Sequence, residues 1–108
     1  MLDQFVLKSV RNYIEALKTA GIFVEMVVVF GSRVKERVHE WSDIDLLVIS
    51  KQFDGMKDRT YINMLWRIAA RTDSRIEPIP CGLQQWHEDD SSAIIEIARR
   101  EGEVLEAA

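Results

Sequence analysis

The chain has 108 residues, of which 47% are apolar and 30% are charged, a balance typical of soluble globular proteins. This length suits one domain with one hydrophobic core and excludes two ordinary domains, so we expect a single domain over residues 1–108. The formal net charge of −4 provides no overall basic field, which argues against a stand-alone nucleic-acid-binding module. We therefore expect no direct binding to DNA or RNA.

Cys81 is the only cysteine, which excludes an intrachain disulfide and a cysteine zinc site. The first residues, MLDQFVLKSVRNY, lack the basic cluster and apolar core of a signal peptide. Glu25 interrupts the longest apolar run well short of a membrane span. We expect a cytoplasmic protein with no membrane association.

Hydrophobic periodicity predicts helices and strands in alternation along the chain. A first amphipathic helix is expected between Asp3, a capping residue, and Gly21, a stop signal. Its apolar positions are Phe5, Val6, Val10, Tyr13, Ile14 and Leu17. The next expected elements are a buried central strand at 22–30, a short polar helix at 32–38, a loop at 39–42 and a second buried strand at 44–49.

A polar turn at 51–55 separates the second strand from a longer predicted helix at 56–72. One face of this helix is formed by Ile62, Leu65, Trp66 and Ala69. Residues 75–80, RIEPIP, predict a short strand whose prolines place it at a sheet edge or end it early. A last helix at 90–100, capped by Asp89 or Asp90 and stopped at Gly102, precedes a small strand at 103–106. The pattern predicts an α/β fold with helices packed on a small sheet.

Two aspartates lie at the start of the second strand. Asp43 and Asp45 are two residues apart, so both carboxylates project from one face of an extended strand. Like charges held this close repel, and a divalent cation relieves that repulsion. Oxygen ligands without cysteine or paired histidines favour Mg²⁺ or Mn²⁺ over zinc. The alternative is a Ser42-Asp43 turn and cap, with Asp45 at a sheet edge.

A glycine and a serine follow the first strand. Gly31 ends the strand and Ser32 opens the short helix, an arrangement that directs free backbone N–H groups and a helix dipole at an anion such as phosphate. The alternative is an ordinary strand-to-helix turn capped by serine. A phosphate-binding turn, ten intervening residues and a metal-binding pair together indicate a site for a nucleoside triphosphate with Mg²⁺.

The segment GSRVKERVHEWSDIDLLV resembles the Gly-Ser, ten residues, Asp-x-Asp signature of minimal nucleotidyltransferases (MNT) of the DNA polymerase beta superfamily. These include small bacterial MNT proteins encoded with HEPN partners. The likeness continues through Phe53-Asp54-Gly55, the arginine-rich helix and IEPIP. It implies a nucleotidyltransferase fold with a small mixed sheet. Many members have a further glycine where this chain has Val34-Lys35-Glu36-Arg37.

The resemblance also implies site roles. Gly31 and Ser32 would hold the β- and γ-phosphates of ATP, and Arg33 either steadies phosphate charge or forms an exposed salt bridge. Asp43 and Asp45 would bind Mg²⁺, with two ions expected. Glu77 matches the place of a third carboxylate that completes the metal site and helps to deprotonate the attacking hydroxyl. Without the resemblance, Glu77 reads as an exposed strand residue.

Three functions follow as hypotheses. The first is Mg²⁺-dependent transfer of AMP from ATP to a tyrosine of a HEPN partner toxin, which makes the chain an antitoxin. The second is a binding protein of the same fold that neutralises or scaffolds a partner by contact alone, and the third is transfer to a small molecule. The sequence is compatible with either a homo-oligomer or a hetero-oligomer.

Overall fold

The computed structural model describes residues 4–30, 43–56, 58–89 and 91–107. In chain order its elements are α1 (Gln4–Thr19), β1 (Met26–Phe30), β2 (Ile44–Ser50), the 3₁₀ helix η2 (Lys51–Phe53), α2 (Thr60–Thr72), β3 (Ile76–Gly82), α3 (Leu83–Glu88), α4 (Ala93–Glu101) and β4 (Glu103–Glu106). The predicted helix at 32–38 and loop at 39–42 lie outside the described residues, as do the capping position Asp3 and Gly31, Ser32 and Arg33.

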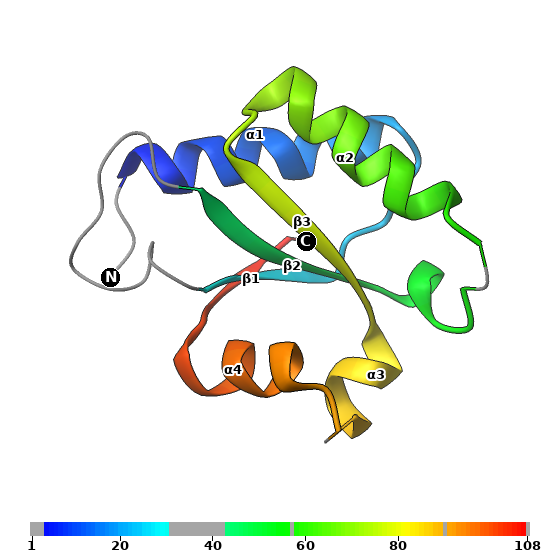
Figure 1. Cartoon of the computed structure of the whole chain (residues 1–108). Coiled ribbons are helices and arrows are strands. Elements are labelled where there is room, and N and C mark those ends of the chain that lie inside the picture. The colour runs from blue at the N-terminus through cyan, green and yellow to red at the C-terminus, as the bar shows by residue number, and fades with distance from the viewer. Residues whose placement is uncertain (1–3, 31–42, 57, 90, 108) are drawn as a thin grey trace.

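The strands form one mixed sheet in the order β3-β2-β1-β4. β2 and β3 run parallel, while β1 is antiparallel to both β2 and β4. Helices α1 and α2 cover one face of the sheet, and α3 and α4 cover the other (Figure 1). The predicted α/β fold with a small mixed sheet is therefore confirmed, and β1 occupies the central position expected for a strand apolar on both faces.

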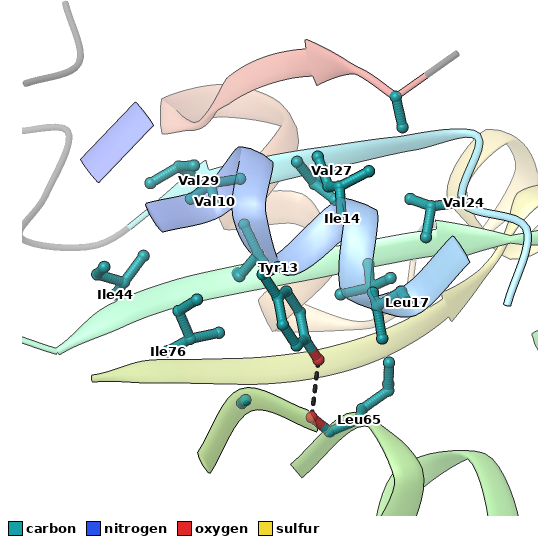
Figure 2. Packing of buried hydrophobic residues seen from close by; sticks show 14 of the residues in the cluster. Val10, Tyr13, Ile14, Leu17, Val24, Val27, Val29, Ile44, Leu65 and Ile76 are labelled. Carbon is teal, nitrogen blue, oxygen red and sulfur yellow. Dashed lines mark hydrogen bonds between the residues drawn. The ribbon is translucent and has the colours of Figure 1, made fainter. Parts of the chain in front are cut away.

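The larger apolar core lies between the sheet and helices α1 and α2. Buried residues of α1 recur at helical spacing and pack on Val27 and Val29 of β1 (Figure 2). These residues are Val6, Val10, Tyr13, Ile14 and Leu17. The Tyr13 hydroxyl donates a 2.8 Å hydrogen bond to the carbonyl of Leu65, which ties α1 to α2 inside the core (Figure 2). Phe5 departs from the prediction, since 79% of it is exposed.

The start of β1 is later than predicted. Residues 22–25 precede the strand because the backbone of Phe23 bonds to side chains instead of a neighbouring strand. Its N–H donates to the Gln52 Oε1 at 2.6 Å, and its carbonyl accepts from the Ser50 hydroxyl at 2.7 Å. Ile22 is still fully buried, so the apolar pattern correctly reported burial but not strand geometry.

Helix α2 also begins later than predicted, at Thr60. The Asp58 carboxylate accepts a 3.0 Å hydrogen bond from the Thr60 N–H, and this local bond favours the start of a helix there. The buried face is formed by Leu65 and Ala69, as predicted. Trp66 is 47% exposed, so its predicted place on the core face is wrong.

β3 is an edge strand, as its prolines predicted, and it extends to Gly82. Helix α3, which was not predicted, follows directly. Its first turn is capped by a residue distant in sequence, because the Asp54 carboxylate accepts from the N–H groups of Gln84 at 3.1 Å and Gln85 at 3.4 Å. The Gln85 side chain adds a local contact, accepting from the Gly82 N–H at 3.2 Å, but the Asp54 cap comes from another segment and cannot be read beside the helix.

Helix α4 begins at Ala93, with the Ser92 hydroxyl accepting from the Ile95 N–H, and ends before Gly102 as predicted. Asp89, a predicted cap, instead accepts from the N–H groups of Ser91 and Ser92 in the preceding turn, at 2.8 and 3.2 Å. The small strand predicted at the end of the described chain is confirmed as β4. Among the described helices, none is long and apolar enough to span a membrane.

Arg99 of α4 connects this helix to α3, which covers the same face of the sheet. Its guanidinium donates to the carbonyls of Asp89 at 2.6 Å and Gln85 at 3.4 Å, and also to that of Trp86. It lies 5.4 Å from the centre of the Trp86 ring as well, a cation–π distance. One side chain thus satisfies the last carbonyls of α3 and fixes α4 beside it.

A second, smaller core lies under α3 and α4 and includes Cys81, which is 1% exposed. Burial, and next the charge of Asp54, raise the pKa of the Cys81 thiol to about 11. Because the thiolate is the reactive form, we expect no reaction with a disulfide reagent at pH 7–8 while the chain is folded, and one equivalent after denaturation. Stoichiometric labelling of the native chain with its circular dichroism unchanged would contradict this burial.

Candidate active site

Three carboxylates gather at one end of the sheet, where β2 and β3 both begin. Asp43 is exposed and immediately precedes β2, and Asp45 is its second residue. Glu77 is the second residue of β3, and the parallel register pairs it directly with Asp45. Paired residues of neighbouring strands project to the same side of a sheet. Asp45 and Glu77 therefore stand next to each other.

The face on which they lie follows from alternation along the strands. Leu47 and Ile49 follow Asp45 by two and four residues on β2, and both belong to the smaller core under α3 and α4. Cys81 follows Glu77 by four residues on β3 and belongs to the same core. Phe30, the last residue of β1, pairs with Asp45 from the other side and is 8% exposed. The carboxylates thus continue an apolar surface at the point where it reaches solvent.

The electrostatics of Glu77 reflect this crowding. Its pKa is raised, first by a hydrogen bond with the Asp45 side chain, then by burial, and then by the negative charges of Asp43 and Asp45. A hydrogen bond between two carboxyl groups requires one proton between them. The side chains that raise the pKa of Glu77, Asp45 and Asp43, are both acidic. A bound cation would relieve this repulsion between carboxylates.

This donor set fits Mg²⁺ or Mn²⁺ in its chemistry. All three groups offer carboxylate oxygens, the ligands that these hard cations prefer. In the described part of the chain, no group of three or more His, Cys, Asp or Glu side chains is already arranged around one ion position. The pair Asp45–Glu77 is in place, and its side chains would have to turn from each other toward an ion.

The phosphate-binding half of the predicted site, Gly31, Ser32 and Arg33, lies outside the described residues. The adjoining position is described, since Phe30 pairs with Asp45. The chain therefore leaves β1 for Gly31 directly beside the carboxylate end of β2.

Sequence reasoning did not find two features near this site. The first is Phe30, the apolar neighbour of Asp45 on β1. The sequence shows that Phe30 precedes Gly31, but its pairing with Asp45 depends on the register of β1 and β2. The other feature is an Asp73–Arg75 ion pair at the entrance to β3. Their spacing alone predicts no contact.

Comparisons with known proteins identify the family and the fold. No curated protein sequence matches the chain. Among solved structures, a Sulfolobus solfataricus protein described as a candidate nucleotidyltransferase has the same fold, with a TM-score of 0.65 and 19% sequence identity over 92% of this chain and 78% of the other. A family model described as "Nucleotidyltransferase domain" matches residues 10–100, which is most of the chain. The chain therefore belongs to the nucleotidyltransferase domain family.

Proposed function

We propose that this chain is a Mg²⁺-dependent nucleotidyltransferase that moves AMP from ATP to a hydroxyl, the acceptor being a tyrosine of a HEPN-type partner toxin. One observation carries the proposal: in a chain of the nucleotidyltransferase family, the β2–β3 register sets Glu77 beside Asp45, and Asp43 lies two residues before Asp45. In this role the chain is an antitoxin. The resemblance of its Gly-Ser, ten residues, Asp-x-Asp segment to the minimal nucleotidyltransferases supports the choice of partner.

Each site residue has a role in this proposal. Gly31 and Ser32 bind the β- and γ-phosphates, with Arg33 beside them, and Asp43, Asp45 and Glu77 hold the divalent ions. When bound, such ions neutralise phosphate charge and stabilise the attacking and leaving oxygens. The acceptor oxygen bonds to the α-phosphorus, the bond to the β-phosphate oxygen breaks, and pyrophosphate leaves. Glu77 also helps to take the proton of the attacking hydroxyl.

The test is transfer of label from α-labelled ATP to the purified HEPN-type partner in the presence of Mg²⁺. We expect label on the partner with the wild-type chain and none with Asp43→Asn plus Asp45→Asn. Replacing the acceptor tyrosine by phenylalanine should remove the signal.

Two results would overturn the proposal. If no nucleotide or metal supports transfer, and the double variant still inhibits the partner fully, the chain is a binding protein of this fold. If label appears on an added small molecule, such as an aminoglycoside, and never on the partner, the acceptor class is wrong.

A further inference from the structure

The outer face of α2 is basic and bears a tryptophan. The exposed positions of this face recur at helical spacing from the N-cap to the last turn, and they are Arg59, Asn63, Trp66, Arg67, Ala70 and Arg71. Of the described α-helices, α2 alone has no acidic side chain. The three arginines of this surface, the α2 strip, form no ion pair with another described residue. Positive charge is therefore concentrated here on a chain whose formal net charge is −4.

Packing does not account for Trp66. It is 47% exposed and belongs to neither apolar core, whereas Leu65 and Ala69 are the buried residues of α2. The acids on either side of the helix, Asp58 and Asp73, accept hydrogen bonds from residues beside them. Tryptophan and arginine are enriched among the residues that dominate binding energy at protein interfaces. The α2 strip thus has the composition of a protein-binding surface.

The α2 strip leads to the end of the sheet where the carboxylates lie. Helix α2 packs on the edge strand β3 and passes into it within four residues, from Thr72 to Ile76 (Figure 1). Glu77 follows Arg71 by six residues, so their Cα atoms are at most about 22 Å apart. An ordinary protein interface covers about 800 Å² on each partner. A protein seated on the strip can therefore also reach the carboxylates.

We propose that the α2 strip docks the protein that accepts the nucleotide, through an acidic surface of that protein that encloses Trp66. The inference rests on the proposed function, because it takes the acceptor to be a protein. Charge complementarity selects an acidic partner. A second copy docked on the same strip about a two-fold axis would set arginines opposite arginines. Nucleic acid is disfavoured because the net charge of the chain is −4.

The experiment is a calorimetric titration of the purified HEPN-type partner into the chain, without ATP. We expect the charge-reversed variant, Arg67→Glu plus Arg71→Glu, to weaken binding at least about 30-fold, the loss that defines an interface hot spot. Trp66→Ala should do the same. The matched control is Lys8→Glu plus Arg11→Glu, at exposed positions of α1, which changes the net charge equally. It should leave the affinity within about twofold, because salt screens distant exposed charges.

Fold and salt provide two further controls. The two reversed arginines are exposed, so circular dichroism of the charge-reversed variant should match the wild type. If Trp66→Ala proves unstable, the charge-reversed variant alone decides. Raising the salt concentration should weaken binding of the wild-type chain and affect the charge-reversed variant less.

Label transfer from α-labelled ATP separates docking from chemistry. The charge-reversed variant should raise the KM for the partner and leave kcat unchanged at saturating partner. Asp43→Asn plus Asp45→Asn should bind the partner like the wild type and transfer no label.

The inference is overturned if the charge-reversed variant binds the partner like the wild type, if the α1 control weakens binding equally, or if the wild-type chain does not bind the partner. It is also overturned if reversing the two arginines abolishes binding of a single-stranded RNA oligonucleotide, or self-association of the chain, but not binding of the partner. If the chain binds the partner through the α2 strip and never transfers label, the docking surface stands and the proposed function falls.

Discussion

Asp45→Asn is expected to abolish nucleotidyl transfer while leaving the fold intact. Asp45 pairs with Phe30 on one side and Glu77 on the other, so its replacement removes the middle carboxylate of the site without changing side-chain size. Loss of a group that merely supports a metal ligand costs about 10–100-fold, so loss of a proposed ligand should cost at least about 100-fold in kcat/KM. Label transfer from α-labelled ATP measures this. Asp58→Asn, the same substitution at an exposed position before α2, is the matched control.

The same variant should be more stable than the wild type at neutral pH when metal is absent. The folded chain raises the pKa of Glu77 above its unfolded value, so ionising Glu77 costs folding free energy as pH rises through the folded pKa. Asp45 is the largest cause of that shift, and asparagine removes its charge. The gain should vanish as pH falls below the ordinary pKa of glutamate. Chemical denaturation at pH 4 and pH 7.5 tests this, and an equal difference at both values would contradict it.

Gly82→Ala is expected to lower the free energy of unfolding by about 1–3 kcal/mol, the usual cost of overpacking. A Cβ at Gly82 would overlap the Asp54 carboxylate and come within 3.0 Å of the Asp54 Cα, a backbone atom that cannot rotate away. The displaced carboxylate is also the cap of α3. Thermal unfolding by circular dichroism measures the loss.

The double variant Gly82→Ala plus Asp54→Ala supplies the control for that prediction. Removing the Asp54 carboxylate eliminates most of the overlap, so the two substitutions together should destabilise the chain less than the sum of the single changes. Simple additivity, or a Gly82→Ala variant that melts like the wild type, would mean that Asp54 does not occupy this space.

The sequence was most informative where side chains report on burial. Val27, Val29, Leu46 and Val48 are fully buried in a continuous apolar pattern, and that pattern correctly predicted a central sheet covered by helices. The two prolines of β3 correctly predicted a strand with one neighbour, because proline cannot donate to a second ladder. The proximity of Asp43 and Asp45 followed from their spacing alone.

The remaining features depend on contacts between distant segments, which spacing does not encode. Glu77 needed the β2–β3 register before it could be placed beside Asp45. Helix α3 depends on Asp54, roughly 30 residues earlier in the chain. Trp66 shows the opposite error, since its helical spacing was compatible with a core face that the actual packing of α2 assigns to Leu65 and Ala69.

The most direct test of the central claim is a crystal structure of the chain with Mn²⁺ and a non-hydrolysable ATP analogue. We predict an anomalous scattering peak bound by Asp43 and Asp45 and shared with the triphosphate, with Glu77 turned toward the metal. A triphosphate bound elsewhere, or bound beside these carboxylates with no ion between them, would contradict the account.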